Sequence, residues 1–169
     1  MDATSQDRRE TLLNTSTQTQ LVVFTLDERH YALLLAAVER IVRAVDVTPL
    51  PNAPRIVLGV IDVEGRVLPV LNIRRRFSLP EREIRPVDQF LIAQTASRTV
   101  ALVVDEAEGV VECPESAVIG SSRIVPGLER FHGLVQLDDG LVLIHDLEKF
   151  LSLDEACALD KAMNQDESC

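Results

Sequence analysis

An internal repeat constrains the fold of this chain more than any other feature of its sequence. When the sequence is aligned with itself at a first offset, which places residue 29 on residue 98, the segment 29–35 (RHYALLL) aligns with 98–104 (RTVALVV). At a second, slightly larger offset, the segment 59–61 (GVI) lies over 133–135 (GLV). Because glycines and turn acids recur in the same order, we interpret the match as a duplicated module; the alternative is the general likeness of apolar strands to one another.

Short β-branched runs make up the repeated part of the chain. Examples are 21–26 (LVVFTL), 100–104 (VALVV) and 141–144 (LVLI), and turn residues separate them. Runs of this length between turns favour strands over helices, and several at short intervals favour a sandwich or barrel. Residues 152–155 (SLDE) form a capping-box pattern that predicts a short C-terminal helix. We therefore expect an all-β fold of two similar modules with short connecting helices.

Composition divides the chain into three parts. Residues 1–19 are polar and lack periodicity, which predicts a flexible N-terminal tail. Residues 20–151 carry the apolar runs and form the expected β domain. Residues 152–169 combine the expected helix with an acidic C-terminal tail.

The charge balance excludes two classes of partner. The chain has 17 Lys and Arg against 27 Asp and Glu, a formal net charge of −10. This field repels nucleic acids and anionic lipids, so we expect no nucleic-acid binding. No apolar run approaches the roughly 20 residues that span a bilayer, and the N-terminus lacks the apolar segment of a signal peptide. We expect no direct membrane insertion.

Candidate catalytic and metal-binding groups are sparse. The three cysteines are far apart with no CxxC pair, the histidines lack metal-ligand spacing, and no phosphate-loop, dinucleotide or hydrolase fingerprint occurs. We therefore predict no enzyme activity, no metal and no cofactor. A remote alternative is a small hydrolase that uses Cys113 and His132 with Asp105 or Asp146.

Several short motifs occur in a fixed order along the β domain. They are Phe24-x-Leu26, Tyr31, Val38-x-x-Ile41, Leu50-Pro51-x-x-Pro54, Gly59-Val60-Ile61, Gly65-x-x-Leu68-Pro69-Val70, Val103-Val104-Asp105, and Gly133 with Leu147-Glu148-Lys149. Together they resemble the CheW-like adaptor family of bacterial chemosensory systems. The resemblance implies two similar five-stranded β-barrels packed together, which agrees with the repeat.

The resemblance also implies a function. Family members without further domains are non-catalytic adaptors in two-component signalling. They link the regulatory domain of a CheA-type histidine kinase to the cytoplasmic tip of a methyl-accepting chemoreceptor. We expect the same of this chain, in the cytoplasm and recruited to membrane-associated receptor–kinase arrays. The alternative is a CheW-like scaffold of a non-swimming pathway, with surface motility or cyclic-dinucleotide output and a dedicated partner set.

Two charged positions depart from the family pattern together. The family usually reads V-x-E-I, whereas this chain has Arg40 in place of the acid. It also usually reads N-L-R-G, whereas this chain has Glu64 in place of the arginine. We predict that the two charged tips lie within contact distance, as an ion pair of reversed polarity. The alternative is two unrelated changes of exposed charge.

The predicted protein-binding residues follow from these motifs. We expect the apolar anchors to be Leu35, Val38, Ile41 and Val103. The charged residues that set register and specificity are expected to be Arg40, Glu64 and Asp105. Two glycines of the same motifs, Gly59 and Gly65, complete the set. Leu35 and Val38 are equally well explained as core residues.

Overall fold

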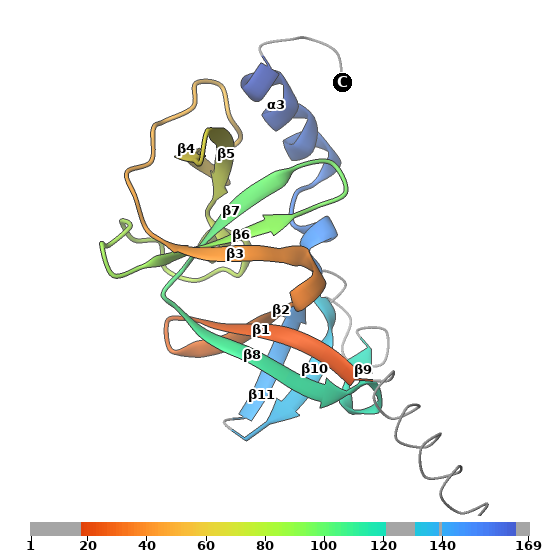
Figure 1. The fold of residues 1–169 in the computed structure, drawn as a ribbon. Helices are drawn as coiled ribbons and strands as arrows, with labels where there is room; N and C mark the ends of the chain where they lie inside the picture. Colours follow the sequence, from red (N-terminus) through yellow and green to blue (C-terminus); the bar gives the residue numbers. More distant parts are fainter. Residues whose placement is uncertain (1–17, 121–130, 139, 165–169) are drawn as a thin grey trace, which may run out of the picture.

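The structure, a computed structural model, describes residues 18–120, 131–138 and 140–164. Two β-sheets lie one above the other, with a helix at the far end of the upper sheet (Figure 1). The expected mostly-β architecture is confirmed. Strand β1 begins at Gln18, two residues before the expected start of the β domain at residue 20, and residues 1–17 lie outside the described residues.

Eleven strands are found in the described part of the chain. They are β1 (Gln18–Leu26), β2 (Arg29–Leu34), β3 (Val38–Arg43), β4 (Val57–Val63), β5 (Arg66–Leu71), β6 (Gln89–Gln94), β7 (Thr99–Val104), β8 (Glu106–Pro114), β9 (Ile119–Gly120), β10 (Phe131–Leu137) and β11 (Gly140–His145). The helices are α2 (Ile73–Arg76) and α3 (Leu153–Asn164), with 3-10 turns at Leu35–Ala37, Glu115–Ala117 and Leu147–Lys149.

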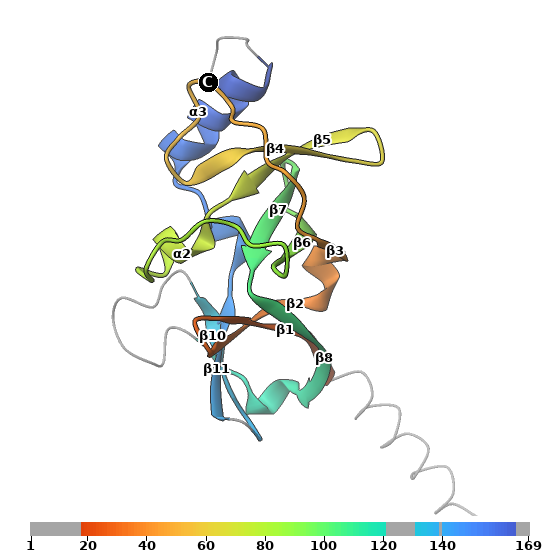
Figure 2. The ribbon, with the colours of Figure 1, turned by 90° about the vertical axis from the view of Figure 1, so that its left-hand side faces the viewer.

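The two sheets exchange strands between the two halves of the chain. Sheet A has the order β8-β1-β2-β11-β10-β9, and sheet B has the order β3-β6-β7-β5-β4. Each sheet therefore combines one hairpin of one half with strands of the other half. The chain crosses from sheet A to sheet B between β2 and β3 and returns between β7 and β8, as Figure 2 shows from the side. Neither half of the repeat is a separate module in space.

Strand register confirms the duplication residue by residue. Leu21 pairs with Leu34, and at the first offset their counterparts Phe90 and Val103 pair in the same way. The hairpins related by the second offset agree as well, because 59 pairs with 70 and 133 pairs with 144. The same agreement holds across the halves, where 42 pairs with 90 and 111 pairs with 21. The repeat therefore specifies one pairing scheme twice.

The sixth strand of sheet A is a small departure from two equal barrels. Strand β9 pairs with β10 through Ile119 and Gly120. Its counterpart in sheet B is a single bridge in which Thr48 and Val60 exchange both backbone hydrogen bonds, at 2.8 and 2.9 Å. The two sheets thus differ in how far this pairing extends and not in topology.

Three apolar clusters hold the fold together. A central cluster draws side chains from both sheets, including Phe24, Leu91 and Phe150, each at most 2% exposed. Two smaller clusters are formed within sheet A and within sheet B. Each fully buried large apolar side chain contributes about 1.5–3 kcal/mol, so the central cluster fixes the sheets against each other.

Helix α3 begins at the predicted capping box. The backbone N–H of Glu155 donates to Ser152 Oγ at 3.1 Å, and the N–H of Ser152 donates to Glu155 Oε1 at 2.9 Å. Leu159 is fully buried in the central cluster, and ion pairs join Arg76 to Glu155 and Arg98 to Asp160. The helix is thereby anchored to the body of the protein.

In the described ranges, no helix has the length and apolarity that crossing a membrane requires.

Candidate functional site

Two ion pairs join strand β3 to the β4–β5 hairpin. Arg40 Nη1 lies 2.8 Å from Glu64 Oε1, and Arg66 Nη2 lies 2.8 Å from Glu39 Oε1. We call these four residues the β3 clamp. The turn is shaped by Asp62, whose carboxylate accepts a hydrogen bond from the N–H of Gly65 at 2.8 Å. The predicted contact between Arg40 and Glu64 is confirmed.

Exposed apolar residues adjoin the β3 clamp in the sequence. Ile41 on β3 is 41% exposed and Val67 on β5 is 56% exposed. The clamp charges are accessible too, with the side chain of Arg40 at 40% and that of Glu64 at 70%. Exposed pairs of this kind contribute only about 0–1 kcal/mol to folding. Apolar side chains beside accessible charges give this surface the composition of a protein interface.

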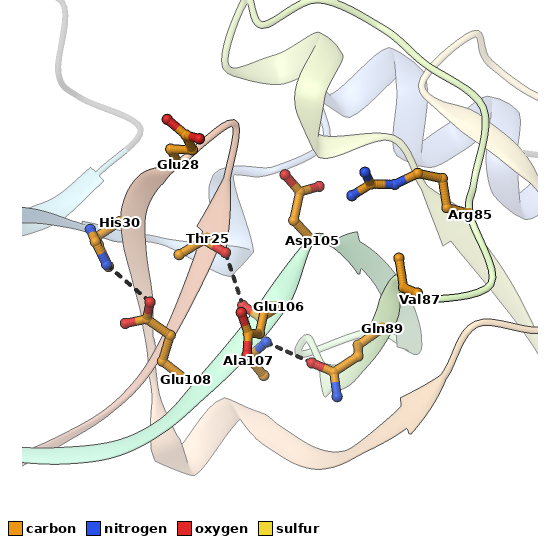
Figure 3. A pocket seen from close by; sticks show the side chains of 10 residues that line it. All are labelled: Thr25, Glu28, His30, Arg85, Val87, Gln89, Asp105, Glu106, Ala107 and Glu108. Atoms are coloured by element: carbon orange, nitrogen blue, oxygen red, sulfur yellow. Dashed lines mark hydrogen bonds and ion pairs between the residues drawn. The ribbon is translucent and has the colours of Figure 1, made fainter.

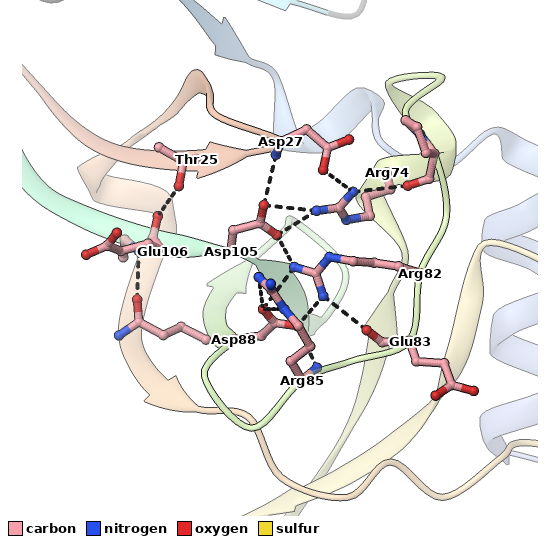
Figure 4. Close-up of polar contacts among 12 residues, drawn as sticks. Thr25, Asp27, Arg74, Arg82, Glu83, Arg85, Asp88, Asp105 and Glu106 are labelled. Carbon is pink, nitrogen blue, oxygen red and sulfur yellow. Dashed lines mark hydrogen bonds and ion pairs between the residues drawn. The ribbon is translucent and has the colours of Figure 1, made fainter.

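A second charged cluster joins the two sheets where the chain crosses from β7 to β8 (Figure 4). Asp105 lies at the crossing and accepts hydrogen bonds from the N–H of Asp27 at 2.8 Å and from Arg74 Nη2 at 2.7 Å. Arg74 also donates to Asp27 Oδ1 at 2.6 Å. Arg82 contacts both Asp105 and Asp88, whose side chain is fully buried. We call these five residues the crossover network.

Burial and hydrogen bonding act in opposite directions on the carboxylates of the crossover network. Burial by itself raises the pKa of Asp105, but hydrogen bonds from Arg74 and the Asp27 N–H, with the charges of Arg74 and Arg82, hold that pKa below its ordinary value. Asp88 behaves alike: burial raises its pKa, and the hydrogen bonds from Arg82 and Arg85 lower it by more. Both side chains are therefore carboxylates at neutral pH.

The crossover network predicts a loss of stability in acid. Because the pKa values of Asp88 and Asp105 are lower in the folded chain, the network contributes its full stability above the unfolded pKa of about 4. This contribution is lost as the pH falls from about 4 through the folded pKa values. Urea unfolding between pH 7 and pH 3 measures it. We expect a shallower acid dependence in Asp105→Asn than in the exposed control Asp46→Asn; equal dependence would contradict the prediction.

The arginine run 74–76 is used inside the protein. Arg74 is 7% exposed in the crossover network, and Arg76 pairs with Glu155 of helix α3. Arg75 donates to the backbone oxygen of Arg55 at 3.3 Å and lies 3.8 Å from Glu81. The run therefore binds to the crossover network, to the segments of Arg55 and Glu81, and to helix α3, and it does not form an open basic patch.

A cleft of about 660 Å³ opens beside the crossover network, between the β1–β2 turn and the segment before β6 (Figure 3). Its walls carry the acids Glu28, Glu106 and Glu108, with Val87 as a 71% exposed apolar side chain. His30 Nε2 lies 3.1 Å from Glu108 Oε1 on one wall. A partner that enters this cleft meets carboxylates more than apolar surface.

The structure divides the predicted binding residues among three places. Four of them are exposed residues of β3 and of the β4–β5 hairpin: Arg40 and Glu64, which form an ion pair, and their sequence neighbours Ile41 and Gly65. Asp105 lines the cleft and belongs to the crossover network. The remaining four lie against or within the core: Leu35 and Val38 pack on the central cluster, Val103 packs on the cluster of sheet B, and Gly59 is buried.

Two members of the β3 clamp, Glu39 and Arg66, and the exposed neighbour Val67 were not predicted from the sequence. A signal for the first two was present. Glu39 precedes Arg40, and Arg66 follows the Glu64–Gly65 turn by one residue. Any contact between Arg40 and Glu64 therefore brings their neighbours together.

The residues of the hypothetical hydrolase do not form a reactive centre. Cys113 is 5% exposed in the sheet A cluster, and burial raises the pKa of its thiol. Asp105 is held by the crossover network, and Asp146 accepts the N–H of Glu148 at 3.1 Å. A nucleophilic cysteine needs access and a lowered pKa. Within the described ranges, no group of three or more histidine, cysteine or acidic side chains is arranged to hold a metal ion.

Known proteins match this chain over most of its length. A family model described as the CheW-like domain matches residues 20–155. Chemotaxis protein CheW of Treponema pallidum is 27% identical over 158 residues, covering 90% of this chain and 93% of that protein. Chemotaxis protein CheW of Thermotoga maritima is 26% identical over 144 residues, covering 84% and 93%. The crystal structure of scaffolding protein TtCheW from Thermoanaerobacter tengcongensis has a TM-score of 0.72 at 23% identity, covering 81% of this chain and 90% of that chain.

The topology of the two sheets agrees with the solved CheW structure, and the family model covers most of the chain. The chain belongs to the CheW-like domain family and is homologous to chemotaxis protein CheW. It is a CheW-like scaffold protein of chemotaxis or chemosensory signalling, and the expected absence of enzyme activity agrees with the non-catalytic character of this family.

Proposed function

We propose that this chain couples a chemoreceptor to a sensor histidine kinase in a chemotaxis-type two-component pathway. Its partners are the regulatory domain of a CheA-type kinase and the cytoplasmic tip of a methyl-accepting chemoreceptor. The chain works in the cytoplasm and joins receptor–kinase arrays at the membrane through these partners. Family membership over residues 20–155 supports the proposal.

The observation that carries the proposal is the Arg40–Glu64 ion pair. The two charges have exchanged places relative to the usual family pattern, and yet they lie 2.8 Å apart. Their exposure leaves them little role in folding. Two complementary charges that meet at an exposed site are better explained by selection for a binding surface than by stability.

The expected role of the pair is specificity. Ile41 and Val67, both exposed and each next in sequence to a clamp arginine, supply apolar contact area. The charges decide which partner fits, because an unmatched or like charge at an interface costs more than a matched pair gains. A partner adapted to Arg40 on β3 and Glu64 on the turn therefore differs in charge from one adapted to the usual family polarity.

A double-mutant cycle on partner binding tests this proposal. We expect Arg40→Glu to weaken binding to the purified kinase regulatory domain or receptor fragment by about tenfold, because two acids then meet at the clamp. Adding Glu64→Arg restores the pair and part of the affinity. The thermal midpoint changes little in either variant. Isothermal titration calorimetry measures the affinities.

Arg55→Glu is the matched control, since it makes the same change of charge at an exposed position before β4. It should leave the affinity near that of the parent protein. Strictly additive effects of the two clamp substitutions would refute the role assigned to the pair. If the parent protein bound neither the kinase domain nor the receptor fragment, the coupling function itself would be wrong.

A further inference from the structure

The β3 clamp has a counterpart on sheet A, because the two halves of the chain use the same strand register. Strand β8 corresponds to β3 by the first offset of the repeat, and the β10–β11 hairpin corresponds to β4–β5 by the second. Five charged positions of the first half map in this way. Glu39, Arg40, Arg43, Glu64 and Arg66 correspond to Glu108, Gly109, Glu112, Asp138 and Gly140.

The counterpart retains the acids and lacks every cation. Gly109 stands where β3 has Arg40, and Gly140 stands where β5 has Arg66. Glu112 stands where β3 has Arg43, so a positive charge is replaced by a negative one. In the first half, each of the two clamp carboxylates forms an ion pair with a clamp arginine. The second half leaves three carboxylates with no arginine or lysine among these positions.

The missing cations leave a groove open. A cavity of about 400 Å³ lies between β8 and the β10–β11 hairpin, where the first half has its two clamp ion pairs. Val23, Val111 and Val142 line its apolar floor. The carboxylates of the counterpart stand at its rim, together with the exposed Val110. Its composition therefore suits an occupant that is apolar on one side and cationic on the other.

Strand β8 also offers a free backbone edge. It is the end strand of sheet A, and within the described residues its strand partner is β1 alone. Side chains of β8 alternate between an exposed face with Glu108, Val110 and Glu112 and an inner face with Val111 and Cys113. A strand added along this edge would place alternate side chains on the same two faces.

We propose that this groove binds an extended segment of a partner protein by strand addition to β8, with arginine or lysine on the outer face and small apolar side chains on the inner face. The apolar side chains lie on the floor beside Val111 and Val142. The cations face Asp138 and Glu108, the counterparts of the acids Glu64 and Glu39, which pair with arginines in the first half. The carboxylates keep local partners meanwhile, since Glu108 lies 3.1 Å from His30 and Glu112 accepts Gln20 Nε2 at 3.0 Å.

The net charge of the chain favours a basic partner segment over a second copy of the chain as the occupant of the groove. The net charge of −10 opposes self-association at an acidic groove. A basic segment gains from the same field, so its affinity should fall as salt is raised. A different explanation is that the glutamates of β8 only prevent edge-to-edge pairing, as charged side chains do on many edge strands. That explanation predicts no binding of any strand.

The probe is a capped peptide of sequence Thr-Val-Arg-Val-Arg-Val-Thr. The control peptide has the same sequence with Glu in place of each Arg. We expect the purified full chain to bind the arginine peptide, with amide shifts at Val110, Val111 and Leu137, and not the glutamate peptide. Glu112→Arg, which introduces the charge found at Arg43 in the first half, should weaken binding about tenfold. Asp138→Asn should weaken it less, and Glu83→Arg, a matched charge reversal away from the groove, should leave it unchanged.

Three outcomes would overturn the proposal. They are equal affinity for the two peptides, equal affinity of Glu112→Arg and Glu83→Arg, and no binding by the parent protein. If the parent protein bound neither peptide, the glutamates of β8 would serve only to prevent edge-to-edge strand pairing. All substituted side chains are exposed, so circular dichroism should show an unchanged fold. The assay contains neither kinase nor receptor, and its result is therefore separate from that of the coupling function.

Discussion

Replacing Arg74 by methionine is expected to lower the free energy of unfolding by about 3–5 kcal/mol, the range measured when one partner of a buried ion pair is removed. Arg74 is 7% exposed and donates to carboxylates on either side of the sheet crossing. Methionine fills much of the same space, and the main loss is therefore the charge. Asp105, 18% exposed, would keep Arg82 as its remaining cation. Urea unfolding at pH 7 measures the change.

Arg75→Met is the matched control, because it changes the neighbouring residue of the same helical turn. The side chain of Arg75 is 34% exposed, and its nearest carboxylate, that of Glu81, lies 3.8 Å away. Its substitution should change the free energy of unfolding by no more than about 0.5 kcal/mol. Equal effects of the two substitutions would show that the crossover network does not stabilise the junction of the sheets.

The pairing scheme of the sheets could be predicted from the repeat, whereas the exchange of strands could not. A repeat shows that two segments fold alike, and the registers at Leu21–Leu34 and Phe90–Val103 agree with this. It does not show whether β3 pairs within its own half or with β6 of the other half. Both arrangements bury the same alternating apolar side chains, so periodicity cannot distinguish them.

The same exchange explains why the crossover network was not predicted. Its contacts join residues 31 and 47 positions apart, from turns that approach each other only after the chain has crossed between sheets. Nothing in the sequence therefore connects Arg74 with Asp105, and Asp105 was predicted to face a partner. Arg40 and Glu64 were different, because each departs from a motif of the family and the two departures are complementary. The network offered no such pair of clues.

Gly59→Ala is the second substitution with a large expected effect. Gly59 has φ +155°, and a Cβ at this position would overlap the backbone oxygen of Thr48. Thr48 cannot withdraw without breaking its bridge to Val60, which contributes both hydrogen bonds of that pairing. Backbone strain and overpacking each cost about 1–3 kcal/mol, so we expect a loss of about 3 kcal/mol or more in the free energy of unfolding.

The repeat supplies an internal comparison for this prediction. Gly133 is the counterpart of Gly59 by the second offset, and a Cβ there would lie 2.6 Å from the backbone oxygen of Ile119. Gly133→Ala should thus also destabilise the protein, by about 2 kcal/mol, since its overlap is smaller. Gly120→Ala is the control, because nothing lies within 4 Å of the added carbon and alanine reduces the entropy of the unfolded chain. If all three variants unfolded at the same urea concentration, close backbone approach at the two bridges could not be what requires glycine in both halves.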